Sequence, residues 1–504
     1  MTDDKEQVVN DCKQETAPAK PVQVHAAPLA IHLETPVKTS TIPAGAAGAK
    51  ATRVRWGILA ILFIVTTINY ADRATISIAG PELKKLLGLS PVEMGFIFSA
   101  FAWSYVLAQL PGGWLLDRFG SKITYFFSIF LWSVFTLMMG WVGFFTGATA
   151  VAVLIGLRLL VGAAEAPSFP GNSRITSAWF PTSERGKAAA IFNSAQYFAT
   201  VLFAPIMGWL VHTFGWESVF YVMGGLGIMM AFIWRKTIYG PKNHPRINAA
   251  ELAYIEAGGG LVDLDSGTKS SAPKINTLAC IKELLSSRML LGIYIGQYCI
   301  NTLTYFFLTW FPVYLVTERH MTILKAGFIA ALPAVAGFLG GVLGGVISDR
   351  MIKSGYSLSV ARKTPIVGGM LLAMSMIFCN YVTADWLVVA IMALAFFGKG
   401  IGALGWAVVS DTSPKEAGGL SGGLFNTFGN TAGITTPIVI GFILQATGSF
   451  AGALVFVGAN AAVAILCYLF MVGDIKRFEF KKSVLLPDTA PVSAGHGAQG
   501  KVGA

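Results

Sequence analysis

Residues 94–116 read MGFIFSAFAWSYVLAQLPGGWLL, and the charged sequence DRFGSK follows them directly at residues 117–122. The first stretch contains no charged residue. An α-helix needs about 20 consecutive, mostly apolar residues to cross the hydrocarbon core of a bilayer. We therefore expect a membrane-spanning helix here, and a polar loop immediately after it.

The composition of the whole chain agrees with a membrane protein. Of its 504 residues, 54% are hydrophobic and 12% are charged, whereas soluble domains carry about 25% charged residues. The net charge of +11 does not indicate nucleic-acid binding, because the basic residues form no stripe interleaved with aromatic residues. The five cysteines are scattered without a CxxC pair, so they predict neither a disulfide framework nor a metal site.

Apolar segments of similar length recur on both sides of residues 94–116. Working outward, we expect twelve spans. They lie at about residues 55–79, 93–116, 122–143, 148–171, 187–211, 217–237, 290–316, 325–347, 363–382, 386–410, 419–444 and 449–472.

The positions of lysine and arginine predict the orientation. Cytoplasmic loops of membrane proteins carry an excess of these residues. If both termini are cytoplasmic, the outer loops hold few of the 37 basic residues, namely Lys84, Lys85, Arg319 and Lys325. Residues 1–50 and 476–504 are then cytoplasmic tails. We expect the first tail to be disordered, because it is polar and lacks an apolar core segment.

Two motifs each occur twice in the chain. The distance along the chain between the two copies is the same for both motifs to within one residue. The sequence PTSERGKAAAIFN at 181–193 matches PKEAGGLSGGLFN at 414–426. The pattern Gly-x-x-x-Asp-Arg ends at Arg118 and again at Arg350. We therefore expect an all-α integral membrane protein whose twelve helices form two six-helix pseudo-repeats, residues 51–237 and 289–475. A cytoplasmic linker, residues 238–288, joins them. Repeats of this kind enclose a central substrate cavity near the middle of the membrane.

Several longer stretches resemble a known family. They are GGWLLDRFGSK (112–122), NYADRATISIAG (69–80), EAPSFPGNSRI (165–175), GQYCINTLTYFFLTWFPVYLV (296–316) and FFGKGIGALGW (396–406). The first resembles the loop signature of the major facilitator superfamily, and the others resemble its anion:cation symporters, most closely the bacterial glucarate/galactarate permeases. The resemblance covers about residues 55–480.

This resemblance implies a secondary transporter in the bacterial inner membrane. It would import a sugar-acid dianion, with D-glucarate or D-galactarate favoured, by proton symport and alternating access. It would work as a monomer in the lipid bilayer, with protons as the coupling ion and no other cofactor. The resemblance also implies that five side chains contact the substrate: Tyr105, Arg158, Gln196, Trp406 and Asn426.

Five ionisable residues lie well inside the expected spans: Asp72, Arg73, Arg158, Glu165 and Lys399. A charge at the bilayer centre costs about 2.5–3.5 kcal/mol on insertion scales, so such residues usually have a function. Arg158 and Glu165 are seven residues apart and share a helix face, but about 10 Å of helix separates them. Each needs another partner, and we expect the cross-helix pairs Asp72–Arg158 and Arg73–Glu165. The alternative is that these charges only fix helix packing.

The count of these charges suggests a mechanism. Three cations and two carboxyl groups would match a dianion whenever both carboxyl groups are protonated. Moving a dianion inward against 100 mV costs about 2 × 2.3 kcal/mol, and two accompanying protons cancel this cost. We therefore expect Asp72 and Glu165 to carry protons, and the substrate to bind Arg73, Arg158 and Lys399.

Uncharged polar residues inside the spans can bind the hydroxyl groups of a sugar acid. The candidates are Tyr105, Gln196, Gln297, Asn301, Tyr305, Trp406, Asn426 and Asn430. Each could instead be a satisfied contact between helices. Tyr305 occupies the position in the second repeat that Asp72 occupies in the first, so we expect the proton chemistry mainly in the first repeat.

Two further features have a structural interpretation. We expect Asp117, Arg118, Asp349 and Arg350, at cytoplasmic helix ends, to form a gate that closes the inner side. The alternative is an ordinary solvated turn. The spacing of Gly337, Gly341 and Gly345 favours close helix packing.

Other functions remain as alternatives. A galactonate or hexuronate proton symporter would share the same features. A phosphate-ester antiporter would need the cations without the carboxyl groups, so Asp72 and Glu165 argue against it. A transporter-like sensor or a membrane enzyme lacks support, because the chain has no signalling domain, HExxH motif or Walker loop. We expect no enzymatic activity.

Overall fold

The computed structural model describes residues 51–264, 277–414 and 417–480. The expected tail at 1–50, most of the one at 476–504 and part of the linker lie outside these residues. The described chain consists of helices and connecting segments, without a β-strand.

The first half, which we define as residues 51–237, contains six long α-helical elements. They are α1 (Val54–Leu87), α2 (Pro91–Met139), α3 (Gly147–Glu165), α4 (Ser168–Trp179), α5 (Thr182–Phe214) and α6 (Glu217–Thr237), with a short 3₁₀ turn at Val142–Phe144. The linker contributes a 3₁₀ turn at Pro241–Asn243, α7 (Ala249–Ala257) and α8 (Thr277–Ser286).

The second half, residues 289–475, is built in the same way. Its helices are α9 (Arg288–Thr309), α10 (Phe311–Thr317), α11 (Ile323–Lys353), α12 (Leu358–Ala373), α13 (Asp385–Ile401), α14 (Gly405–Thr412), α15 (Gly418–Thr447) and α16 (Ala451–Leu466). A 3₁₀ segment (Met374–Tyr381) continues α12, and a π-helical turn (Cys467–Met471) continues α16.

The helix lengths account for twelve spans. Among the described residues, ten helical segments are long and apolar enough to cross a membrane, and the bent pair α9–α10 provides an eleventh. One of the ten, Pro91–Phe144, has 54 residues and would be about 80 Å long as a single helix. Gly120 breaks it, with φ 77° and ψ 164°, so this segment forms two spans. The expected twelve-helix membrane fold is confirmed.

Two of the spans are broken close to an expected functional residue. The fourth span changes from α3 to α4 at residues 166 and 167, directly after Glu165. The tenth span changes from α13 to α14 at residues 402–404, shortly after Lys399. Discontinuous helices of this kind often mark the substrate region of transporters. The two breaks stand at corresponding places in the two halves.

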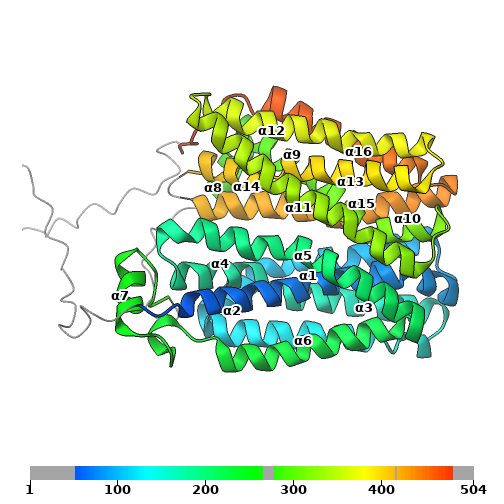
Figure 1. The fold of residues 1–504 in the computed structure, drawn as a ribbon, viewed down its shortest axis with the longest axis horizontal. Helices are drawn as coiled ribbons and strands as arrows, with labels where there is room; N and C mark the ends of the chain where they lie inside the picture. Colours follow the sequence, from blue (N-terminus) through cyan, green and yellow to red (C-terminus); the bar gives the residue numbers. More distant parts are fainter. Residues whose placement is uncertain (1–50, 265–276, 415–416, 481–504) are drawn as a thin grey trace, which may run out of the picture. The chain divides into compact units, whose positions relative to one another are not determined.

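Glycines allow the two halves to approach closely at one end of the bundle. We call the end that holds α7 the linker face, and the end where α1 finishes at Leu87 the far face (Figure 1). Near the far face, a Cβ on Gly95 of α2 would lie 2.6 Å from the carbonyl oxygen of Pro437 in α15. A Cβ on Gly327 of α11 would lie 2.7 Å from the carbonyl oxygen of Ala204 in α5. Larger side chains at these glycines would force the halves apart.

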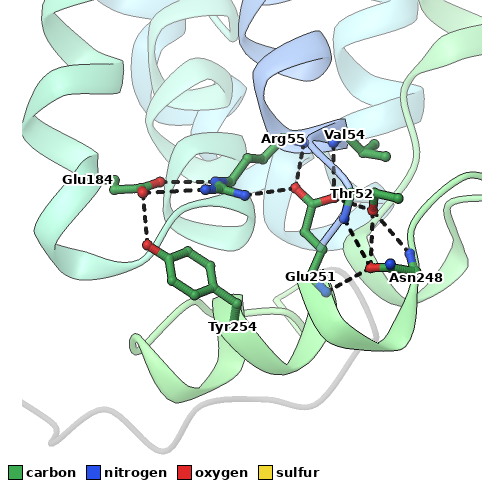
Figure 2. A network of polar contacts seen from close by, with 7 residues as sticks. All are labelled: Thr52, Val54, Arg55, Glu184, Asn248, Glu251 and Tyr254. Atoms are coloured by element: carbon green, nitrogen blue, oxygen red, sulfur yellow. Dashed lines mark hydrogen bonds and ion pairs between the residues drawn. The ribbon is translucent and has the colours of Figure 1, made fainter. Parts of the chain in front are cut away.

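At the linker face, α7 holds the beginning of α1 (Figure 2). The first amides of a helix lack partners within the helix, and here the buried carboxylate of Glu251 accepts hydrogen bonds from them. The distances are 2.9 Å from the Val54 amide and 3.2 Å from the Arg55 amide. The Arg55 guanidinium lies between two carboxylates, 3.0 Å from Glu251 and 3.0 Å from Glu184 of α5. Thr52 donates a further hydrogen bond, of 2.6 Å, to Glu251.

Tyr254 completes this network from the next turn of α7. Its hydroxyl group donates a 2.9 Å hydrogen bond to the Glu184 carboxylate (Figure 2). That hydrogen bond and the negative charge of Glu184 raise the pKa of Tyr254. The network therefore fastens the linker to α1 and α5 of the first half.

We expect Glu251→Ala to lower the thermal stability of the purified protein. The substitution removes one partner of a buried ion pair and leaves the first amides of α1 unsatisfied, a loss of about 3 kcal/mol. The midpoint of thermal unfolding in detergent measures it. Glu256→Ala, at an exposed position of the same helix, is the control and should change the midpoint little. Equal midpoints for the two variants would contradict the role of Glu251.

Candidate functional site

The five expected charges are all buried in the fold. Each is at most 5% exposed: Asp72 and Arg73 on α1, Arg158 and Glu165 on α3, and Lys399 on α13. Four of them belong to the first half and one to the second. Burial of so many ionisable groups needs partners, because an isolated ion in an apolar interior is very costly.

Arg73 and Glu165 form the only ion pair among these five in the described part of the chain. The guanidinium Nε of Arg73 lies 2.8 Å from Oε2 of Glu165, as the sequence predicts. The pair connects α1 to the last residue of α3. It is incomplete, since Nη2 of Arg73 and Oε1 of Glu165 have no hydrogen-bond partner.

Aromatic rings surround the Arg73 guanidinium on its other sides. The ring centres of Tyr70, Phe101 and Tyr105 lie 4.9, 4.7 and 4.8 Å from it. The faces of aromatic rings attract cations, most strongly where water is excluded. These rings therefore replace part of the water that the cation loses on burial. They also place Tyr105, an expected substrate contact, directly beside the ion pair.

Arg158 lies near the same aromatic cluster but has weaker support. Its guanidinium carbon is 5.2 Å from the centre of the Phe101 ring. Its Nε and Nη1 atoms have no hydrogen-bond partner. Buried donors of this kind are rare in folded proteins, and they leave Arg158 able to receive an anionic group.

The expected Asp72–Arg158 ion pair is not formed among the described residues. Asp72 instead accepts a 2.7 Å hydrogen bond from the hydroxyl group of Thr136, in the second part of α2. Its other oxygen has no partner. Successive residues on a helix point about 100° apart. Because Arg73 points toward α3, its neighbour Asp72 points toward Thr136.

Lys399 has no carboxylate partner in the described structure. Its ammonium group lies 5.1 Å from the ring centre of Phe396 and 5.6 Å from that of Tyr197 on α5. Tyr197 belongs to the first half, so Lys399 is placed beside the boundary between the halves.

A chain of uncharged polar groups runs through the second half. Tyr305 donates a 2.9 Å hydrogen bond to Asn430, whose amide donates a 3.1 Å bond to Asn426. Asn426 in turn donates a 3.3 Å bond to Gln109 of α2 in the first half. These contacts join the expected polar residues of α9 and α15 within the second half, and the bond from Asn426 to Gln109 links them to the first half.

Two glycines create space for the remaining polar pair. Gln297 donates a 3.3 Å hydrogen bond to Asn301, one turn further along α9. A Cβ on Gly405 would lie 2.6 Å from Oε1 of Gln297, and a Cβ on Gly429 would lie 2.7 Å from Nδ2 of Asn301. Trp406 is half-exposed and packs edge-on against Phe425, with 4.9 Å between ring centres.

A small cavity lies between the halves. It is lined from the first half by Tyr70, Gln196 and Tyr197, among others, and from the second by Phe396 and neighbours in α9, α10 and α11. Its volume is about 60 Å³, which holds a few water molecules. Typical sites for small molecules have about 300–1,000 Å³. A six-carbon acid therefore does not fit this cavity without further separation of the halves.

The two aspartates of the expected gate pair with arginines of neighbouring helices. Asp117 pairs with Arg174 of α4, at 2.5 Å, while Arg118 stacks on the Trp114 and Phe119 rings. Asp117 is thus paired with an arginine of another helix.

In the second half, Asp349 lies 3.9 Å from Arg362 of α12. Arg362 also forms a 2.9 Å ion pair with Asp411 of α14. Arg350 is exposed and takes no part in these pairs. Each gate aspartate therefore pairs within its own half. Its partner is an arginine on a neighbouring helix and not the arginine that follows it in the sequence.

Sequence reasoning missed several residues that complete the site. Thr136 and Phe101 contact the buried charges, Gln109 bridges the halves, and Arg174 and Arg362 hold the gate aspartates. Thr136 is one of several hydroxyl residues in its apolar span, so nothing in the sequence singles it out. The two arginines lie on α4 and α12, and their distance along the chain from the aspartates hides the pairing.

Known proteins share this architecture. Residues 62–361 match the family described as Major Facilitator Superfamily. A Bacillus subtilis (strain 168) protein named "Probable galactarate/D-glucarate transporter GudP" is 64% identical over 449 residues, covering 89% of this chain and 98% of the relative. The Escherichia coli (strain K12) protein of the same name is 63% identical over 433 residues, covering 86% of this chain and 96% of the relative.

A solved structure agrees with the fold. The crystal structure of a D-xylose-proton symporter has a TM-score of 0.63 at 15% identity, and the match covers 84% of this chain and 98% of that one. Together with the relatives, this settles the family. The chain belongs to the Major Facilitator Superfamily and is a membrane transporter, not an enzyme.

Proposed function

We propose that this chain imports galactarate or D-glucarate, each as a dianion, together with protons. The names of the relatives supply the substrate class. The single observation that carries the proposal is the set of three buried cations and two buried carboxyl groups, of which only Arg73 and Glu165 form an ion pair within the described residues. Such a site gains from an anion that brings its own negative charges.

The orientation follows from the basic residues. At the linker face, the described helix ends carry arginines and lysines such as Arg55, Arg118, Lys122, Arg185 and Lys187. The far face carries few, chiefly Lys84, Lys85, Arg319 and Lys325. By the positive-inside rule the linker face is cytoplasmic. We propose a bacterial inner-membrane protein with both termini in the cytoplasm, working as a monomer.

The free atoms of the site suggest how proton and substrate alternate. Arg158 offers two unpartnered nitrogen atoms to a substrate carboxylate. Glu165 competes with the substrate for Arg73, so protonation of Glu165 releases that guanidinium for binding. Asp72, which has one unpartnered oxygen, is the second proton carrier. When the carboxyl groups ionise again, they recover the cations and the dianion leaves.

The uncharged residues supply hydrogen bonds to the hydroxyl groups. In this proposal the acid binds between Tyr105 and Gln196 of the first half and the polar chain of the second. That chain contains Tyr305, Asn430 and Asn426. The second half also contributes Gln297 and Asn301, which are hydrogen-bonded to each other, together with Lys399 and Trp406. Because both halves contribute binding residues, substrate binding depends on the distance between the halves.

The close glycine contacts support a state in which the outer side is closed. In this state Asp117 and Asp349 are paired within their own halves and do not join the halves at the cytoplasmic side. We propose that they, with Arg118 and Arg350, form contacts between the halves only when the transporter opens outward.

Sugar acids with a single carboxylate form an alternative substrate class. A galactonate or hexuronate symporter would use the same charges, because each of these acids also carries a carboxylate and several hydroxyl groups. The two carboxyl groups of the site favour proton coupling over phosphate-ester exchange.

We expect Glu165→Gln to abolish uptake of labelled galactarate into proteoliposomes under an acid-outside pH gradient. The amide cannot release and rebind a proton, so the gradient no longer drives transport. Exchange of internal for external galactarate needs no net proton movement and should persist. Glu256→Gln, on the exposed side of α7, is the control and should retain proton-driven uptake. Full gradient-driven uptake by Glu165→Gln would refute the role of this residue.

We expect Arg158→Gln to impair binding itself. Hydrogen bonds to a charged group contribute about 1.5–3 kcal/mol, so the KM of both uptake and exchange should rise roughly tenfold to a hundredfold. The measurement is the concentration dependence of galactarate exchange, with Arg246→Gln in the exposed linker as the control. An unchanged KM in a monodisperse Arg158→Gln preparation would remove Arg158 from the binding site.

A further inference from the structure

A second, larger cavity lies at the far face, well away from the buried charges. It has a volume of about 720 Å³. Its walls come from both halves, from residues 81–89 at the end of α1 and from residues 316–322 after α10. We call it the far-face cavity. A ligand that fills it would touch both halves at once.

The charged lining of the far-face cavity is entirely basic. Lys84, Lys85 and His320 line it, and none of the described lining residues is acidic. Lys85 is paired only at the surface, with Glu82 at 3.3 Å and both side chains well exposed, an interaction worth little in water. Thr317 and Thr322 add hydroxyl groups to the same walls.

Two other basic residues of this face share one carboxylate outside the cavity lining. Arg319 forms a 2.8 Å ion pair with Asp385, and Lys325 lies 4.0 Å from the same carboxylate. Among the ion pairs of the described residues, none involves Lys84 or His320. Arg319 and Lys325 therefore share Asp385. Among the described ion pairs, the exposed one between Lys85 and Glu82 is the only one that involves a residue lining the cavity.

His320 has an unusual backbone conformation. It is the one non-glycine residue of the described chain with positive φ, at 51°. It lies in the left-handed region, two residues after the C-cap of α10 at Glu318. Keeping an imidazole there has a conformational cost, and such costs concentrate at functional positions. A simpler reading of the lysines is that they balance the negative end of α1, but that reading gives no role to His320.

We propose that the far-face cavity is a second anion site, which binds a small dianion between Lys84 and Lys85 of the first half and His320 of the second. The dianion is the substrate itself or an inorganic dianion such as sulfate, since both present two negative charges. This inference rests on the proposed function for the nature of the substrate and for placing the far face outside the cell.

Binding at this site is linked to the state of the transporter. The two walls belong to different halves, and they separate when the far face opens. A ligand that contacts both walls binds more tightly to the closed state and therefore shifts the population toward it. High external dianion concentrations should thus delay the reopening that each new transport cycle needs.

The first test needs no transport activity. Sulfate is titrated against purified protein in detergent at constant ionic strength, with chloride as the balancing anion, and the midpoint of thermal unfolding is recorded. A ligand that binds the folded state raises the midpoint with its concentration. The double variant Lys84→Gln/His320→Gly should lose part of this rise. Glycine suits the left-handed position, so this variant keeps the backbone while removing the imidazole.

Lys325→Gln is the matched control, because Lys325 is a lysine at the same face outside the cavity lining. It should keep the wild-type response. Sulfate also stabilises proteins in general, and that part of the rise is common to all three proteins. Identical sulfate responses of the double variant and the control would overturn the proposal.

The second test identifies the physiological ligand. Initial proton-driven uptake is measured over a wide range of external galactarate, with and without external sulfate. We expect wild-type uptake to pass through a maximum and then fall by about twofold, and the double variant to saturate without a fall and with little change in KM.

If only sulfate slows the wild type, the ligand is the inorganic dianion. If neither anion slows it, the coupling to outer closure is wrong. A protein that takes up no galactarate at any concentration would refute the proposed function, while the sulfate titration would still decide the anion site.

Discussion

The ion pair between Arg73 and Glu165 determines how the first half is arranged. Both side chains are almost completely buried, and removing one partner of such a pair leaves an uncompensated charge at a cost of several kcal/mol. The pair therefore fixes the rotation of α1 about its own axis relative to the end of α3. Once Arg73 faces Glu165, Asp72 must face Thr136, and Tyr70 must lie beside both the guanidinium and the cavity between the halves.

The two halves share a helical plan but differ in their chemistry. Glu165 and Lys399 stand at corresponding helix breaks, in the fourth and tenth spans, and carry opposite charges. The first half surrounds its charges with aromatic rings, whereas the second uses the neutral hydrogen-bonded chain from Tyr305 to Asn426. The first half thus holds four of the five buried charges, and the second half offers mainly neutral hydrogen-bonding groups beside Lys399.

The sequence predicts the spans well because the bilayer imposes a length and an apolar character on each of them. It also predicts the Arg73–Glu165 pair, since helix periodicity shows that Arg158 cannot reach Glu165. The prediction of an Asp72–Arg158 pair is wrong. The direction of the Asp72 side chain depends on how the helices pack around α1, and the sequence does not show that packing. The glycine stripe shows the same limit. Gly337, Gly340 and Gly344 pack closely on α13, while Gly345 of the expected set has open space beside it.

The capping of α1 by Glu251 has a consequence for how the chain assembles during synthesis. The beginning of the first span is completed by a residue that leaves the ribosome almost two hundred residues later. Until α7 has been translated, the early amides of α1 and the Arg55 guanidinium must be satisfied by water or by lipid headgroups. The first six spans can therefore enter the membrane one after another, but their end at the linker face becomes rigid only when the linker has emerged and docked.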